Sequence, residues 1–218
     1  AMEKHNITGI DMVVVNLYPF RQTIEKPNVS LEDAIENIDI GGPAMIRAAS
    51  KNFKYVTVVV NPARYSDILR QLAEEGAISS SFRMSLAKEA FSHTAEYDAC
   101  IAGYLAGQLG EGQFAETVHL VYEKVQPLRY GENPQQQAAF YREKNSAASG
   151  VANAHQLHGK ELSFNNIVDV ESAYNIVAEF DEPAAAIIKH TNPCGTGIGK
   201  TLDEAYEKAY SADPVSAF

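Results

Sequence analysis

Residues 11–17, Asp11-Met12-Val13-Val14-Val15-Asn16-Leu17, form a short β-branched run that Tyr18-Pro19 brings to an end. Such a run is typical of a buried strand. Tyr55 to Val60 forms a second run of the same kind. Between and after the two runs, apolar residues recur at helical spacing. The alternation of strands with helices predicts a layered α/β domain in the first half of the chain.

Helix boundaries in this half are marked by capping residues and by breaks. Ser30-Leu31-Glu32-Asp33 resembles a capping box. Gly41-Gly42-Pro43 breaks and restarts the chain, because glycine permits a tight turn and proline suits a first helical turn. The predicted helices run from Leu31 to about Asp39, around residues 45–51, from Asn61 to about Glu75, from Ser81 to Ser92 and from Glu96 to Gln108.

The second half opens with irregular backbone. Two prolines, a glycine and an asparagine fall within Pro127 to Pro134, so we place a domain boundary just before this segment, giving parts 1–124 and 125–218. The elements predicted beyond it are a strand over Gln137–Tyr141, a helix over Val168–Phe180, a small buried strand over Ala184–Ile188, a loop over Lys189–Gly199, and a helix from about Leu202 with Thr201 and Glu204 as a capping box.

The composition indicates a globular protein with an acidic surface. The chain carries 18 basic and 28 acidic residues, for a formal net charge of −10, which repels a nucleic-acid backbone in the absence of a basic patch. No run of roughly 18 apolar residues predicts a membrane span, and the N-terminus does not resemble a signal peptide. We expect a cytoplasmic protein with no nucleic-acid or membrane partner, in which Cys100 and Cys194 are reduced.

The loop predicted over Lys189–Gly199 has the position of a ligand site, because ligands of α/β proteins bind beyond the carboxyl ends of the strands. Its Lys189-His190 pair combines a cation with an imidazole that titrates near neutral pH. Such a pair suits proton transfer together with stabilisation of a developing oxyanion. The alternative is an exposed polar pair with no role in catalysis.

Two other chemistries match this loop only in part. Gly199-Lys200-Thr201 fits the end of the phosphate-binding pattern G-x-x-x-x-G-K-[ST], but Cys194 stands where the first glycine is required. A nucleotide-triphosphate site is therefore the weaker interpretation, and Gly197 and Gly199 are expected to shape a turn. Cys194 also fits half of the zinc-deaminase pattern P-C-x-x-C, whose second cysteine is replaced by Gly197, so a catalytic zinc is not expected.

Four polar residues of the first half lie at or just beyond the ends of predicted elements: Asn16, Tyr18, Asp39 and Lys51. One interpretation is a shared site. The other gives each residue a structural role, with Tyr18 as a half-buried aromatic, Asp39 as a turn residue, and Lys51 as a cation that the helix dipole favours at the C-terminal end.

Ordered motifs along almost the whole chain resemble one family. They are Asn16-Leu17-Tyr18-Pro19-Phe20, Ile38-Asp39-Ile40-Gly41-Gly42, Arg47-Ala48-Ala49-Ser50-Lys51-Asn52, Leu128-Arg129-Tyr130-Gly131-Glu132-Asn133-Pro134, Lys189-His190-Thr191-Asn192-Pro193-Cys194-Gly195 and Asp213-Pro214-Val215-Ser216-Ala217-Phe218. Taken together, they resemble the bifunctional enzymes that join a phosphoribosylaminoimidazolecarboxamide formyltransferase to an IMP cyclohydrolase, which complete de novo purine biosynthesis.

The resemblance implies a fold and a pair of reactions. The first part would be the C-terminal portion of a methylglyoxal-synthase-like α/β cyclohydrolase domain, and the second the start of a cytidine-deaminase-like α/β formyltransferase domain. The co-substrate 10-formyltetrahydrofolate would formylate aminoimidazole carboxamide ribotide (AICAR) to FAICAR. Cyclodehydration of FAICAR would then yield inosine monophosphate (IMP). The family needs no catalytic metal and forms homodimers.

The resemblance also implies residue roles. In formyl transfer, His190 would be the base and Lys189 the cation that stabilises the oxyanion, while Arg129 and Tyr130 would hold the ribotide. In ring closure, Lys51 would transfer protons, and Asp39 and Tyr18 would position it and the substrate. The nucleotide-binding residues of this second site would be Asn16, Ile40 and Gly41.

The chain departs from the family in length. The family's N-terminal serine-rich phosphate loop has no counterpart before Asn16, and most of the folate and ribotide site would lie beyond Phe218. Neither active site is therefore expected to be complete in this chain. A fragment that binds nucleotide without turnover is the alternative.

Overall fold

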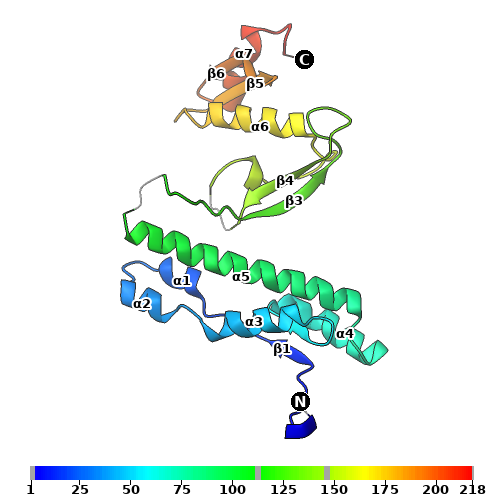
Figure 1. The fold of residues 1–218 in the computed structure, drawn as a ribbon. Coiled ribbons are helices and arrows are strands. Elements are labelled where there is room, and N and C mark those ends of the chain that lie inside the picture. The colour runs from blue at the N-terminus through cyan, green and yellow to red at the C-terminus, as the bar shows by residue number, and fades with distance from the viewer. Residues whose placement is uncertain (1–2, 111–113, 145–147, 218) are drawn as a thin grey trace. The chain divides into compact units, whose positions relative to one another are not determined.

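The computed structural model describes residues 3–110, 114–144 and 148–217 (Figure 1). Contacts between residues divide the chain into two compact units, Ala1–His119 and Leu120–Phe218. The boundary predicted at residues 124/125 lies inside strand β3 (Tyr122–Leu128), which belongs to the second unit.

The first unit contains a parallel pair of strands, β1 (Met12–Val14) and β2 (Thr57–Val59). Strand β2 is buried throughout, as predicted. Strand β1 is only half-buried, with Val14 49% exposed, so the prediction of a buried strand is wrong at this position. The difference arises because β2 packs against two helices, α3 and α5, whereas β1 packs against α3.

The helices of this unit follow the predicted order, with one addition and one fusion. Ser30 caps α2 by accepting a hydrogen bond from the Asp33 N–H at 3.0 Å, as its sequence predicts. The short helix α1 was not predicted. The helices are α1 (Phe20–Ile24), α2 (Leu31–Glu36), α3 (Gly41–Lys51), α4 (Tyr65–Glu75) and α5 (Ser80–Gln108), with 3₁₀ helices at Glu3–His5 and Pro62–Arg64.

Helix α5 is continuous where two helices were predicted with a break between Ser92 and Glu96, so that prediction is wrong. At the expected break, the side-chain hydroxyl groups donate hydrogen bonds to carbonyl groups of the same helix. Ser92 donates to the Lys88 carbonyl at 3.0 Å, and the buried Thr94 donates to the Phe91 carbonyl at 3.2 Å. Because no glycine or proline intervenes, nothing ends the helix there.

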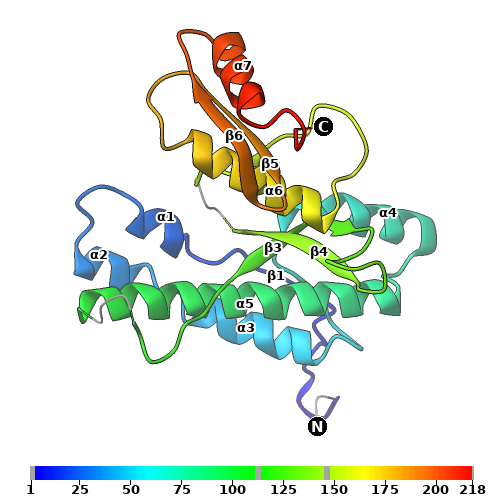
Figure 2. The same cartoon turned by 90° about the horizontal axis from the view of Figure 1, so that it is seen from above.

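The core of the first unit lies between the sheet and α5. Figure 2 shows α3 running alongside α5, and Ile46, Val58 and Ala90 are buried where these two helices meet β2. Burying a side chain the size of Ile46 or Val58 contributes roughly 1.5–3 kcal/mol. Farther along α5, the 1% exposed Phe20 packs edge-to-face against Tyr97 and Tyr104, which anchors the chain that follows β1.

The second unit contains an antiparallel pair, β3 (Tyr122–Leu128) and β4 (Ala138–Glu143), with an irregularity between Lys124 and Gln126. Strand β4 lies where a strand was predicted. Pro127 and Leu128, predicted as irregular backbone, belong to β3. The connection between the strands is held by Gln136, whose carbonyl accepts the Gly131 N–H at 2.9 Å and whose side chain accepts the Asn133 N–H at 3.0 Å.

The remainder of this unit consists of α6 (Phe164–Val177), the antiparallel hairpin β5 (Ala184–Lys189) with β6 (Asn192–Ile198), and α7 (Leu202–Ala212), preceded by a 3₁₀ helix at Val151–Asn153. Both predicted helices are present, with α6 beginning four residues earlier than expected at Phe164 rather than Val168. Strand β5 is half-buried rather than buried, because it belongs to a sheet of only two strands among the described residues.

The predicted loop over Lys189–Gly199 is wrong, because most of it is strand β6. Its glycines alternate along the chain and lie against α7. A Cβ built at Gly195 collides with the Ala209 carbonyl oxygen, and one built at Gly199 comes within 2.8 Å of the Ala205 nitrogen. Glycine is required here because the backbones of β6 and α7 approach so closely, and the three glycines do not form a turn.

Candidate functional site

The turn between α2 and α3 brings two of the predicted site residues, Asp39 and Tyr18, into contact. One carboxylate oxygen of Asp39 accepts the Gly42 N–H at 2.7 Å, and the other accepts the Tyr18 N–H at 3.3 Å. Asp39 therefore ties the segment after β1 to the first turn of α3. Both of its carboxylate oxygens are engaged by backbone donors, so Asp39 acts here as an anchor for the chain.

Four other predicted site residues of the first unit are accessible to solvent. Ile40 is 77% exposed and Tyr18 is 56% exposed, and Gly41 and Asn16 are exposed as well. Gly41 opens α3, but most donors of this first turn are already used. Asp39 accepts the Gly42 N–H, Pro43 has no N–H, and the Ala44 N–H donates to the Ile40 carbonyl.

Lys51 lies at the other end of the same helix. Helix α3 begins at Gly41 and ends at Lys51, a separation of about 15 Å along the helix axis. Asp39, which precedes α3, and Lys51 thus lie at opposite ends of this helix, and the positioning of Lys51 by Asp39 stays a prediction. Lys51 occupies the last helical turn and is exposed, where the helix dipole favours a cation.

Sequence reasoning missed Tyr97, which contacts the same turn from α5. Its hydroxyl accepts the Asp39 N–H at 2.8 Å and donates to the Asn37 carbonyl at 3.2 Å. Burial raises the pKa of Tyr97, with a smaller contribution from the charge of Asp39. An aromatic at helical spacing reads as an ordinary core residue, so no local signal marks it.

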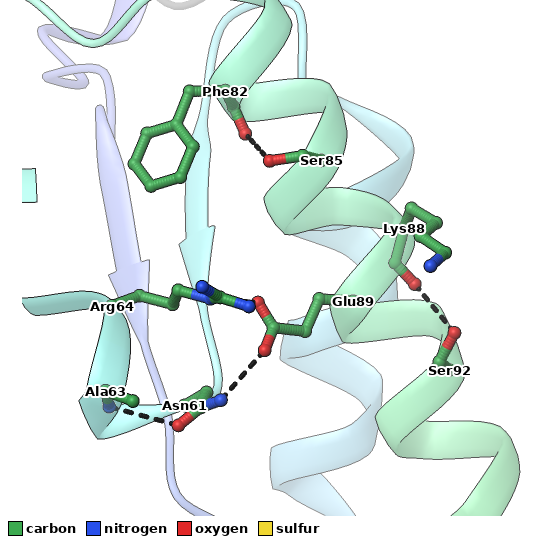
Figure 3. A network of polar contacts seen from close by, with 8 residues as sticks. All are labelled: Asn61, Ala63, Arg64, Phe82, Ser85, Lys88, Glu89 and Ser92. Atoms are coloured by element: carbon green, nitrogen blue, oxygen red, sulfur yellow. Dashed lines mark hydrogen bonds and ion pairs between the residues drawn. The ribbon is translucent and has the colours of Figure 1, made fainter. Parts of the chain in front are cut away.

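A second polar cluster that sequence reasoning missed follows β2 (Figure 3). Glu89 of α5 accepts hydrogen bonds from Asn61 at 2.8 Å and from Arg64 at 2.9 Å. Burial raises the pKa of Glu89, but the hydrogen bonds from Arg64 and Asn61 and the charge of Arg64 outweigh it, so the pKa lies below its ordinary value. Because Asn61 also caps the 3₁₀ helix at Pro62–Arg64, this cluster fixes the chain at the carboxyl end of β2.

In the second unit, Lys189 ends β5 and His190 begins the hairpin turn. His190 and Thr191 have φ values of 53° and 63°, and the flanking Lys189 and Asn192 pair with each other. Two-residue hairpin turns with positive φ at both positions favour Asn-Gly or similar pairs. Two side chains with a Cβ occupy this turn instead, at an energetic cost typical of functional positions.

Neighbouring polar groups stabilise this turn. The carboxylate of Asp169 on α6 accepts the Thr191 N–H at 2.8 Å, and the Asn192 side chain donates to the His190 carbonyl at 2.8 Å. His190 and Lys189 are exposed. Hydrogen bonds from Ser216 lower the pKa of Asp213, and the charge of Lys189 adds to this effect.

Arg129 and Tyr130 lie just after β3, on the other two-stranded sheet of this unit. The Arg129 guanidinium lies 5.8 Å from the centre of the Tyr130 ring. Arg129 is exposed, as required of a side chain that binds phosphate. The pair is held close to the Gly131–Gln136 turn rather than on the hairpin that carries His190.

The interpretation of Gly195 to Thr201 as a phosphate loop is wrong. Strand β6 runs through Ile198, and residues 199–201 connect it directly to α7. The Thr201 hydroxyl accepts the Glu204 N–H at 3.2 Å, as predicted for a helix cap, but the Glu204 carboxylate accepts the Lys200 N–H at 2.8 Å, one residue earlier than a capping box requires. These bonds occupy donors that a phosphate would need.

Within the described residues, no three His, Cys, Asp or Glu side chains are grouped so that they could hold a metal ion. Cys100 and Cys194 are free thiols, and burial raises the pKa of Cys100. In the same part of the chain, no helix has the length and apolar character needed to cross a membrane.

The chain is similar in sequence to known protein families and to individual curated proteins. Residues 49–218 match the family model described as AICARFT/IMPCHase bienzyme, and residues 1–44 match the MGS-like domain. The whole chain is 58% identical over 224 residues to the bifunctional purine biosynthesis protein PurH of Desulfitobacterium hafniense (strain DSM 10664 / DCB-2), covering 43% of that protein. PurH of Halalkalibacterium halodurans is 55% identical over 217 residues, and the whole chain covers 42% of it.

Among solved structures, the crystal structure of ForH matches 46% of this chain and 53% of its own, with 36% identity and a TM-score of 0.38. The chain thus spans less than half the length of the curated relatives it matches. The MGS-like match, together with the mixed strands and helices, confirms the predicted α/β class. Because the bienzyme model covers most of the chain, the chain belongs to the AICARFT/IMPCHase bienzyme family.

Proposed function

We propose that the protein containing this chain catalyses the last two steps of de novo purine biosynthesis in the cytoplasm. It would transfer a formyl group from 10-formyltetrahydrofolate to AICAR, giving FAICAR, and then cyclise FAICAR to IMP. The identity of 58% to a protein named for a bifunctional role in purine biosynthesis supports both activities. Residues 1–124 would belong to the cyclohydrolase domain, and residues 125–218 would begin a cytidine-deaminase-like formyltransferase domain.

The His190–Thr191 turn is the observation that carries the formyl transfer. Two consecutive residues with positive φ hold Lys189 and His190 at the exposed tip of a hairpin, and three hydrogen bonds of the turn maintain this conformation. A turn that retains side chains where glycine is easier indicates that those side chains have a use.

In the proposed transfer, the AICAR amine attacks the formyl carbon of the folate. The amine is a weak nucleophile because its lone pair is delocalised into the ring and the carboxamide, so His190 removes its proton as the new C–N bond forms. Lys189 stabilises the negative charge that develops on the formyl oxygen. Collapse of the tetrahedral intermediate breaks the bond to the folate nitrogen, which takes up a proton and leaves as tetrahydrofolate. Arg129 and Tyr130 would hold the ribotide, with Arg129 on its phosphate.

In the proposed ring closure, the carboxamide nitrogen attacks the formyl carbon of FAICAR, and the formyl oxygen then leaves as water. Ile40 and Gly41 follow Asp39 and Asn16 follows β1; all three are exposed and would contact the nucleotide. Tyr18 lies beside them and would orient the substrate. Lys51 would transfer protons, on the basis of the family resemblance. The reaction is expected to need no metal, and the enzyme is expected to be a homodimer.

Two alanine variants of the full-length protein test the assignment. His190→Ala should abolish formyl transfer from 10-formyltetrahydrofolate to AICAR while cyclisation of added FAICAR continues. Lys51→Ala should show the reverse pattern. Retention of formyl transfer in His190→Ala would remove the base from the mechanism, and binding of IMP without either turnover in the wild type would favour a non-catalytic nucleotide-binding role.

A further inference from the structure

The Tyr97 hydroxyl uses both of its hydrogen-bonding capacities on the backbone of the α2–α3 turn. It accepts from the Asp39 N–H at 2.8 Å and donates to the Asn37 carbonyl at 3.2 Å. These two bonds hold the chain on either side of Ile38, although Tyr97 lies 58 positions after Asp39 in the sequence. The turn is therefore held by α5 as well as by its own hydrogen bonds.

The ring of Tyr97 contacts the other segment of the same candidate site. It packs edge-to-face on Phe20, with ring centres 6.3 Å apart, and Phe20 directly follows the Asn16–Pro19 segment. Tyr97 thus touches both parts of the chain that carry the predicted nucleotide-binding residues.

The effect of Tyr97 extends to the exposed residues through Asp39. With its backbone held by Tyr97, Asp39 directs its carboxylate to the Gly42 N–H at 2.7 Å and the Tyr18 N–H at 3.3 Å. The Tyr97 hydroxyl keeps its proton at neutral pH, because the ordinary pKa of tyrosine is about 10 and burial raises the pKa of Tyr97 further, so it remains a donor to Asn37.

We propose that Tyr97 is a positioning residue for ring closure, which holds the Asp39–Gly41 turn in the conformation that receives the nucleotide. The inference rests on the proposed cyclohydrolase function and names a residue that acts on the substrate through Asp39 and its neighbours. Tyr97 itself lies on the inner side of the turn, part-buried, and takes no part in proton transfer.

The test is Tyr97→Phe in the full-length protein, with Tyr104→Phe as the matched control. Both tyrosines lie on α5 and pack edge-to-face on Phe20, and the two hydrogen bonds described to the α2–α3 turn come from Tyr97. Tyr97→Phe should raise the KM for FAICAR about tenfold, with a smaller fall in kcat, because a misplaced binding turn weakens nucleotide binding. Formyl transfer should be unchanged, and Tyr104→Phe should resemble the wild type in both reactions.

A second measurement separates positioning from simple destabilisation. Saturating IMP should raise the thermal midpoint of the wild type and of Tyr104→Phe more than that of Tyr97→Phe, because the rise depends on the affinity of the folded state. If Tyr97→Phe keeps the wild-type KM, or loses stability yet keeps the full IMP-dependent rise, Tyr97 is only structural and the proposal is wrong. If the wild type itself does not convert FAICAR, the proposed function fails first, and the role of Tyr97 in it fails too.

Discussion

The carboxylate of Asp169 accepts a hydrogen bond from the backbone N–H of Thr191 at 2.8 Å. This bond joins the first turns of α6 to the tip of the β5–β6 hairpin, 22 residues farther along the chain. The donor, Thr191, has a positive φ, which is unfavourable for a residue with a Cβ. The contact gives a physical reason for the conformation that exposes Lys189 and His190.

Asp169→Ala should therefore reduce formyl transfer while ring closure stays at the wild-type level. A hydrogen bond to a charged acceptor contributes about 1.5–3 kcal/mol, so kcat/KM for transfer should fall by roughly tenfold to a hundredfold. Asp169→Asn keeps an acceptor oxygen and should recover most of the activity. Equal transfer rates in the alanine variant and the wild type would show that the turn holds its shape without Asp169.

Gly197→Ala should destabilise the second unit. A Cβ at this position lies 2.7 Å from the Ala209 nitrogen and 2.8 Å from the Lys208 Cβ, and it also meets the Ala205 carbonyl oxygen. Overpacking typically costs about 1–3 kcal/mol, which a lowered thermal midpoint should report. Gly103→Ala is the control, because this exposed helical glycine has open space around it and alanine favours helix by up to about 1 kcal/mol. A Gly197→Ala protein as stable as the control would argue against close strand–helix contact.

Glu89 should make the stability of the folded protein depend on pH. Its pKa is lowered in the folded state, so its contribution is present at neutral pH and is lost as the pH falls below the ordinary value of 4.5 and through the folded-state pKa. Thermal midpoints of wild type and Glu89→Gln should differ at pH 7 and converge on acidification. Glu36→Gln, which removes one exposed negative charge, serves as the reference. A wild-type advantage that grows as the pH falls would contradict this sign.

Lys200→Ala should leave formyl transfer and ring closure unchanged. The Lys200 side chain is exposed, and the start of α7 is already capped by Thr201 and Glu204. The purified full-length protein is expected to show no magnesium-dependent ATP hydrolysis above background. ATP turnover in the wild type that disappears in Lys200→Ala would restore the phosphate-loop interpretation.

Local signals in the sequence determined the positions of most helices and the family. The caps at Ser30 and Thr201 were predictable because a capping side chain acts within three residues of its own position. The helix after Gly41 was predictable because Pro43 suits a first helical turn, although no side chain caps this helix. Ordered motifs also placed the chain in a family that the comparisons confirm.

Only the tertiary structure decided what the glycines after Cys194 do and which residues support the candidate sites. Gly195 and Gly197 face α7 from within a strand, although glycines close together are equally typical of a loop. The Tyr97–Asp39 and Asp169–Thr191 bonds join residues 58 and 22 positions apart. Such pairs depend on how whole elements pack, and the spacing of residues along one helix or strand carries no information about them.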